Sequence, residues 1–295
     1  MNLILTGSTG FLGSHLLRRL IRLNHNVVCL KRKISNLWRV DSLLDKADWL
    51  NLENIDLKEV LISKKIDCII HCATNYGRKE IDPLQTIEAN LLLPLKLLHA
   101  SKNTKVFSFI NTDTVLDKRI SHYSLSKGQF VDWLKFYSEE YIIINLALEH
   151  FYGPGDDSTK FSSFIINELI DNKEKDIDLT KGQQKRDFIY IDDVISAFEV
   201  LLSKLKKMEN SFHHFEVGTN ELVSIKDFVL TVKKFCSNEK TKLKFGSLPY
   251  RKDETMETNV DTKALRSLGW TPKFTLKEGL RLTIEKEKRK LLKSP

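Results

Sequence analysis

The sequence predicts an α/β protein: a doubly wound parallel sheet with a smaller, mostly C-terminal substrate-binding lobe. Short apolar runs alternate with helical patterns through the first half of the chain, and a glycine-rich loop follows the first of these runs. Beyond residue 152 the composition becomes more polar and the alternation less regular. Strands that alternate with helices are typical of parallel sheets, because parallel neighbours need crossover connections.

Each element of the predicted sheet has its own signal. A buried strand is predicted at 2–6, and the apolar spacing that starts at Phe11 predicts a helix after the glycine-rich loop. Pro83 marks the start of another helix, because proline is favoured in a first helical turn. Residues 34–55 give no clear pattern. Further strands are predicted at 27–30, 66–72, 106–110 and 142–148, and further helices at 58–65, 83–101 and 124–140.

The order of these elements is that of a Rossmann-type dinucleotide-binding fold. We predict that this domain comprises residues 1–152 and 184–212, because a strand at 186–191 and the helix after it return the chain to the sheet. Residues 153–183 and 213–295 are predicted to form the smaller lobe.

Composition narrows the class of protein. No apolar run approaches the length that crosses a membrane, and no signal-peptide pattern begins the chain, so we expect a cytoplasmic protein with no membrane partner. The net charge of +8 is spread along the chain, which argues against a nucleic-acid partner. No metal site is predicted, because strand alternation sends His71 to the face opposite Cys68 and Cys72.

The glycine-rich loop, residues 6–13, predicts a dinucleotide site. Its glycines are spaced G-x-x-G-x-x-G between a predicted strand and a predicted helix. Glycine allows the tight turn, and the N–H groups of a helix N-terminus favour a pyrophosphate. The loop residues expected to bind the cofactor are Gly7, Thr9, Gly10, Phe11, Leu12 and Gly13.

The end of the second strand indicates which nicotinamide cofactor fits. A site for NAD(H) usually has an acidic residue there for the ribose hydroxyls, whereas the 2′-phosphate of NADP(H) needs a cation. Residues 30–33 contain Arg32 and Lys33 and no acid. We therefore expect NADP(H) rather than NAD(H), with Arg32 as the main phosphate ligand. An exposed basic turn is the alternative interpretation.

Tyr123 and Lys127 form the predicted catalytic pair. Four residues apart on a helix, they project from one face. Free tyrosine has a pKa of about 10, and a cation at about 4 Å in an effective dielectric of about 20 interacts with the phenolate by roughly 4 kcal/mol. That attraction moves the tyrosine toward proton transfer near neutral pH.

Thr112 is the third catalytic candidate. It follows the strand predicted at 106–110, and open α/β sheets bind ligands at the carboxyl ends of their strands. Its hydroxyl is placed to hydrogen-bond a substrate carbonyl; a turn that ends the strand is the alternative interpretation.

Taken together, these features resemble the extended short-chain dehydrogenases/reductases, the NAD-dependent epimerase/dehydratase superfamily, and more narrowly the 4-reductases of the CDP-abequose synthase type. The motifs that carry the resemblance are spread over nearly the whole chain. They are Ile69–Thr74 with Tyr76–Gly77, Asn111–Asp113, Leu148–His150 before Tyr152–Asp156, Arg186–Ile189, Val217–Thr219, Arg251 with Glu254, and Leu268–Pro272.

The resemblance implies that hydride passes from the nicotinamide to the C4 ketone of a nucleoside-diphosphate 4-keto-6-deoxyhexose, for surface-polysaccharide (O-antigen) sugar synthesis. Tyr123 would protonate O4, Lys127 would hold the nicotinamide ribose, and Thr112 would orient the carbonyl. A homodimer through helices 83–101 and 124–140 is also implied. The other implied residues are Ala73 and Thr74 for the cofactor, and Tyr76, Thr114, His150, Lys160, Phe161, Arg186 and Arg251 for the sugar nucleotide.

Of these, the two arginines would grip the diphosphate; the alternative interpretation is that either one pairs with a nearby acid, Arg186 with Asp187 for example. In the 4,6-dehydratases the threonine is followed by Asp-Glu, the acid and base of water loss. Thr114 replaces that glutamate here, so dehydration is not expected. Ten residues separate Thr112 from Tyr123, fewer than in many relatives, which predicts a short loop beside the sugar.

Two other functions stay open. A sugar-nucleotide 4-epimerase requires only the Tyr, Lys and Ser/Thr set found here, although it typically retains NAD, which the basic strand end disfavours. A nonenzymatic NADP-sensing protein on the same fold is the third hypothesis. The Tyr123/Lys127 pair disfavours it, because a sensor needs no proton donor.

Overall fold

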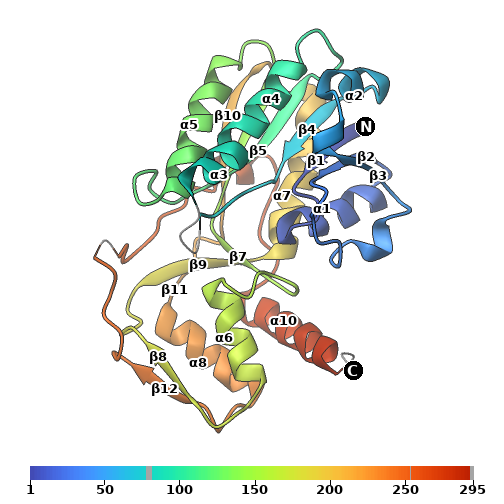
Figure 1. Ribbon diagram of the computed structural model, residues 1–295. Helices are drawn as coiled ribbons and strands as arrows, with labels where there is room; N and C mark the ends of the chain where they lie inside the picture. The colour runs from blue at the N-terminus through green and yellow to red at the C-terminus, as the bar shows by residue number, and fades with distance from the viewer. Residues whose placement is uncertain (78–81, 253, 293–295) are drawn as a thin grey trace. The chain divides into compact units, whose positions relative to one another are not determined.

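The computed structural model describes residues 1–77, 82–252 and 254–292, which divide into two compact units (Figure 1). Unit 1 consists of Met1–Leu148 and Ala197–Glu216, and unit 2 of Glu149–Ser196 and Val217–Pro295. The predicted α/β fold with its parallel sheet is confirmed. That the first part binds a dinucleotide and the second a sugar nucleotide stays a prediction.

Unit 1 is built on a seven-stranded sheet in the order β10-β6-β5-β4-β1-β2-β3. Neighbouring strands from β3 to β6 are parallel. The strands are β1 Asn2–Thr6, β2 Asn26–Lys31, β3 Asp48–Asn51, β4 Cys68–His71, β5 Ser108–Thr114, β6 Ile142–Leu148 and β10 Ser211–Val217. The strand order reverses between β1 and β4, which is where ligands bind in sheets of this kind.

Helices α4 and α5 lie together on one side of this sheet, and α1 lies on the other (Figure 1). Phe130 and Leu134 of α5 are fully buried. Those side chains pack in one cluster with Ile4, Ile69 and Phe109 from the strands. The helices are α1 Phe11–Arg22, α2 Leu57–Ser63, α3 Pro83–Ile87, α4 Leu93–Ala100 and α5 His122–Phe136, and α7 Ile191–Lys204 runs from unit 2 into unit 1.

One row of polar side chains crosses the sheet near the carboxyl ends of its central strands. The register aligns Thr6 of β1 with His71 of β4, then with Asn111 of β5 and Asn145 of β6. All four side chains are fully buried. Hydrogen bonds join Thr6 to His71 and Asn111 to Asn145, so the row links the strand ends in two pairs, β1 with β4 and β5 with β6.

Four expectations about elements in unit 1 need correction. The unassigned segment 34–55 contains the edge strand β3, whose four residues are too few for a periodic signal. The helix expected at 83–101 is interrupted by a π-helical turn, Glu88–Leu92. Strand β5 continues to Thr114 rather than ending near residue 110, and α5 begins at His122 rather than at 124. Tyr123 therefore lies in the first helical turn.

The described residues of unit 2 form two small sheets, four whole helices and the start of α7. Strand β9 Lys185–Tyr190 lies between β7 His150–Tyr152 and β11 Leu222–Ser224, and β8 Asp176–Leu179 pairs with β12 Lys242–Phe245. The helices are α6 Phe161–Ile170, α8 Ile225–Cys236, α9 Lys263–Ser267 and α10 Leu276–Leu291. No helix in the described part of the chain is long and apolar enough to span a membrane.

Candidate active site

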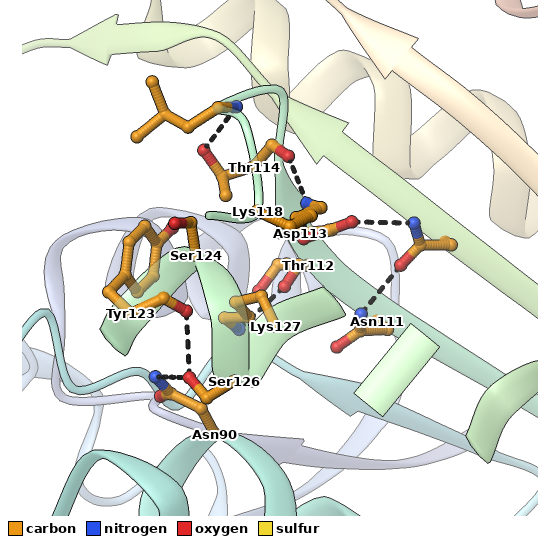
Figure 2. Close-up of polar contacts among 12 residues, drawn as sticks. Asn90, Asn111, Thr112, Asp113, Thr114, Lys118, Tyr123, Ser124, Ser126 and Lys127 are labelled. Carbon is orange, nitrogen blue, oxygen red and sulfur yellow. Dashed lines mark hydrogen bonds and ion pairs between the residues drawn. The ribbon is translucent and has the colours of Figure 1, made fainter. Parts of the chain in front are cut away.

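The predicted catalytic pair lies at the start of α5. The Ser121 hydroxyl caps this helix by accepting a hydrogen bond from the Ser124 N–H at 3.1 Å. The cap fixes the first turn, which carries Tyr123, and Lys127 follows one turn later. Lys127 is 1% exposed, and its ammonium donates a hydrogen bond to the Thr112 carbonyl oxygen at 2.8 Å (Figure 2).

Burial lowers the pKa of Lys127 to about 8. Opposing that effect, the Asp113 carboxylate and the Cys72 thiol raise the pKa, while Lys118 lowers it further. His71 is fully buried nearby; burial and the charge of Lys127 hold its pKa well below 6.5, so it is neutral. Lys127 is therefore a buried cation that loses its proton more easily than an ordinary lysine.

Thr112 lies within β5, not in a turn that ends it. Its side chain is buried, and its hydroxyl donates a hydrogen bond to the His71 carbonyl oxygen at 3.0 Å. The alternative interpretation of Thr112 as a turn residue is therefore wrong. The turn occurs two residues later, where the Thr114 hydroxyl accepts a hydrogen bond from the Leu116 N–H at 3.2 Å.

Asn90, in the π-helical turn, is a site residue that the sequence interpretation missed. Its fully buried amide donates hydrogen bonds to the Asn75 carbonyl oxygen at 2.9 Å and to the Ser126 hydroxyl at 3.0 Å, and its oxygen accepts from the Asn75 N–H at 2.8 Å. The Ser126 hydroxyl in turn donates to the Tyr123 carbonyl oxygen at 2.8 Å (Figure 2). The sequence signal that could have revealed Asn90 is a polar asparagine within the apolar pattern of the helix expected at 83–101.

This network places the segment after β4 beside the catalytic helix. The ring of Tyr76, a predicted substrate contact, lies 5.0 Å from the ring of Tyr123. On the other side, the Ala73 N–H donates a hydrogen bond to the Thr6 hydroxyl at 3.2 Å, and the same hydroxyl lies 2.8 Å from His71 Nδ1. Residues 73–76 thus connect the glycine-rich loop with Tyr123.

The glycine-rich loop has the shape that a dinucleotide cradle needs. Gly7 has φ +68°, and a Cβ added there would lie 2.5 Å from the Ala73 nitrogen. A Cβ at Gly13 would lie 2.1 Å from the Gly7 carbonyl oxygen. In the described structure no side chain caps α1 at Gly10, and the N–H groups of such a helix start are suited to bind an anion. These residues fit a pyrophosphate.

The end of β2 is basic, as predicted, but an acid lies beside it. Arg32 is exposed, and its N–H donates to the Ser35 hydroxyl at 3.1 Å. The Glu53 carboxylate, which follows β3, accepts from the Lys33 N–H at 3.1 and 3.3 Å. Residues 30–33 contain no acid, but the pairing of β2 with β3 brings Glu53 to the same place.

Unit 2 holds the predicted substrate residues that follow β6. His150 Nδ1 lies 2.8 Å from the Glu149 carboxylate, and Lys160 forms a 3.0 Å ion pair with the buried Asp156. Phe161 is the first residue of α6. These contacts fix the side chains without assigning them a ligand.

Arg186 does pair with an acid, as the alternative interpretation has it, but that acid is Glu254 and not Asp187. Arg186 donates to the Glu254 carboxylate at 2.7 Å, with both side chains mostly buried. Asp187 instead accepts from the Thr219 N–H and hydroxyl and from the Asn220 N–H. Arg251 is exposed.

The model of the NAD-dependent epimerase/dehydratase family matches residues 3–218. This chain belongs to that family. It is 37% identical over 289 residues to a CDP-abequose synthase of Salmonella muenchen, with 95% of both chains covered. It is also 26% identical to a putative UDP-glucose 4-epimerase of Methanocaldococcus jannaschii, over 96% of this chain and 97% of that protein.

Solved structures of the family share the whole fold. A UDP-glucose 4-epimerase of Thermotoga maritima aligns over 99% of this chain and 100% of its own, with a TM-score of 0.85 and 22% identity. A UDP-glucuronic acid 4-epimerase of Bacillus cereus, solved with UDP-glucuronic acid and NAD, aligns over 98% and 99%, with a TM-score of 0.84 and 25% identity. The sequence-based assignment to this superfamily is confirmed, and with it an enzyme that uses a nicotinamide cofactor.

Proposed function

We propose that this enzyme uses NADPH to reduce the C4 ketone of a nucleoside-diphosphate 4-keto-6-deoxyhexose. The observation that carries the proposal is the Lys127 ammonium, buried at the end of β5 and one helical turn from Tyr123. The likeness to CDP-abequose synthases over nearly the whole chain supports a sugar-nucleotide substrate. The buried Lys127 and this likeness together favour Tyr123 as an acid that protonates the oxygen of a sugar ketone during its reduction.

In this mechanism the residues of the chain transfer one proton to the substrate. Tyr123 donates it to the O4 alkoxide that forms as C4 is reduced, and the positive charge of Lys127 favours that transfer. Thr112 lies on β5 beside the pair, where its hydroxyl orients the carbonyl after exchanging its bond to His71. NADPH, when bound, supplies the hydride.

Dehydration is disfavoured by the environment of Asp113 as well as by Thr114. In the 4,6-dehydratases the corresponding aspartate is an acid of water loss. Here both carboxylate oxygens of Asp113 are occupied, one by Lys118 at 2.7 Å and the other by the Asn145 amide at 3.1 Å. With both oxygens engaged by these two donors, the carboxylate is poorly placed to serve as an acid of water loss.

The preference for NADPH rests on Arg32, whose exposed guanidinium at the end of β2 suits a 2′-phosphate. Glu53 does not overturn this assignment, because its carboxylate is occupied by the Lys33 N–H. In unit 2 we assign the diphosphate to Arg186 and Arg251. Glu254 would then release Arg186 when the nucleotide binds.

A sugar-nucleotide 4-epimerase is the second candidate. Solved 4-epimerases share the fold over nearly the full length of this chain, and the resemblance implies that epimerisation would use the same Tyr123 and Lys127. The two functions differ in stoichiometry: a reductase consumes one NADPH for each sugar, whereas an epimerase regenerates its cofactor.

One experiment separates the candidates. The purified enzyme is incubated with NADPH and, separately, with the CDP-, dTDP-, GDP- and UDP-linked 4-ketosugars, and nicotinamide absorbance and product configuration at C4 are measured. We expect stoichiometric loss of NADPH with at least one substrate. Interconversion of UDP-glucose and UDP-galactose without net loss would establish the epimerase, and binding of NADPH without any turnover would indicate a sensor.

We also propose a homodimer formed through α5. Its outer face carries Leu125, Trp133 and Phe136 at helical spacing, and their exposed fractions are 46%, 42% and 72%. A stripe of large exposed apolar side chains is typical of a protein interface.

A further inference from the structure

A lysine folds back over α5 and closes the short loop between β5 and this helix. The Lys118 ammonium donates hydrogen bonds to the Asp113 carboxylate and to the Thr114 carbonyl oxygen, both at 2.7 Å (Figure 2). Its stem lies against Gly128, where an added Cβ would come within 3.0 Å of the Lys118 Cγ. Lys118 therefore links the end of β5 to the helical residue that follows Lys127.

The carboxylate that Lys118 holds is buried and fixed on its other side. The Asp113 side chain is 3% exposed, and its second oxygen accepts from the Asn145 amide at 3.1 Å. The Asn145 oxygen accepts from the Asn111 amide at 2.7 Å. Lys118 itself is 36% exposed, so Asp113 is the buried partner, and removing Lys118 leaves a buried carboxylate without its cation.

We propose that the Lys118–Asp113 ion pair is a positioning element for the reaction, holding the end of β5 against α5 so that Thr112 keeps its place beside Tyr123 and Lys127. The measurement of turnover in this test rests on the proposed function, because it needs the 4-ketosugar substrate. Both side chains flank the catalytic groups in sequence: Asp113 follows Thr112 directly, and Lys118 lies in the ten-residue link to Tyr123. Because this link is short, a shift of the start of α5 would also shift Thr112.

The same loop contains a second ion pair that serves as a matched control. Arg119 and Asp117 lie 2.6 Å apart, and their side chains are 87% and 45% exposed. The hydrogen bonds of the Asp117 carboxylate go to Arg119. An exposed pair of this kind contributes little to stability and has no connection to the end of β5.

The two partners act on Lys127 with opposite signs. The charge of Asp113 raises the pKa of Lys127 and that of Lys118 lowers it. The other titratable groups that interact with Lys127 are Cys72 and His71, and Tyr123 lies one helical turn before it on α5. Lys118→Met and Asp113→Asn both break the ion pair, but the first should move the ionisation of the Tyr123/Lys127 pair to higher pH and the second to lower pH.

The experiment compares Lys118→Met, Asp113→Asn, Lys118→Arg and Asp117→Asn. We measure kcat and KM with the 4-ketosugar that wild type reduces, NADPH affinity by fluorescence, and the pH dependence of both. A substrate-free readout is the ultraviolet titration of tyrosinate, with the Tyr123→Phe signal subtracted. A lost positioning element should lower kcat on the order of tenfold to a hundredfold, with NADPH affinity changed by less than about twofold.

We expect opposite pH shifts for Lys118→Met and Asp113→Asn, recovery of most of kcat in Lys118→Arg, and no change in Asp117→Asn. Shifts in the same direction, no shift, or an equal loss in Asp117→Asn would overturn the proposal. The titration needs no sugar. If wild type reduces none of the panel but the midpoints still move in opposite directions, the proposed function fails and the role of the ion pair stands.

Discussion

The Lys127 ammonium lies 2.8 Å from the carbonyl oxygen of Thr112, so the catalytic helix is tied to the backbone of β5 rather than to a carboxylate. A carbonyl accepts the hydrogen bond without neutralising the charge. The cation therefore acts on its neighbours at close range in a buried setting, where electrostatic interactions are strong. The hydrogen bond thus joins the helix that carries Tyr123, the proposed proton donor, to the strand that carries Thr112, the proposed carbonyl ligand.

Tyr123→Phe should abolish turnover while leaving NADPH binding intact. The change removes the proposed proton donor and keeps the ring, so kcat should fall on the order of a thousandfold. Single-turnover kinetics and fluorescence titration with NADPH measure the two effects. Tyr137→Phe, on a ring packed beside Tyr141 at the end of the same helix, is the control and should behave as wild type. Undiminished reduction by Tyr123→Phe would refute the mechanism.

Arg32→Asp should weaken NADPH binding on the order of tenfold to a hundredfold, because charge-assisted hydrogen bonds to the 2′-phosphate are lost. NADH affinity should change far less. Calorimetric titration with both cofactors checks this, and Lys46→Asp, at an exposed position outside the β2 end, corrects for general charge. Equal losses for the two cofactors would show that Arg32 does not read the phosphate.

Lys127→Met should abolish turnover and raise stability. Burial lowers the folded-state pKa of Lys127 to about 8, below the reference value of 10.5, so wild type gains stability as pH rises between these values. The variant's advantage, on the order of 1 kcal/mol or more, should be full below about pH 8 and vanish near pH 10.5.

Thermal unfolding at pH 7 and pH 10 tests this prediction. Lys135→Met removes an exposed lysine from the same helix and should leave stability nearly unchanged at both pH values. A Lys127→Met variant less stable than wild type at pH 7 would mean that the charge of Lys127 stabilises the fold.

Phe136→Lys should convert the proposed dimer to a monomer. Phe136 is 72% exposed on α5, and a charge there would be buried at the interface without a partner. Sedimentation velocity measures the state. Ile34→Lys, at an 83% exposed position away from α5, is the control. Wild type that sediments as a monomer at micromolar concentration would end the proposal.

Local patterns were sufficient for much of the fold. The strand Ile142–Leu148 and the helix that begins at Phe11 appear as expected, because long apolar runs and helical apolar spacing act within a few residues. Short or irregular elements were not predicted from the sequence. Strand β3 has four residues, and the π-helical turn at Glu88–Leu92 has no periodicity of its own, since its role is to place Asn90 against Ser126.

The sequence by itself determined the family, the glycine cradle and the Tyr123/Lys127 pair, because these depend on residue types at fixed spacing along the chain. Only the tertiary structure decided the partners: Glu53 at Lys33, Glu254 at Arg186, and Lys118 with Asn145 at Asp113. Each of these partners comes from another element or from a loop that folds back. Hydrogen bonds and ion pairs act over about 3 Å of space, and spacing along the chain does not specify which residues lie within that distance.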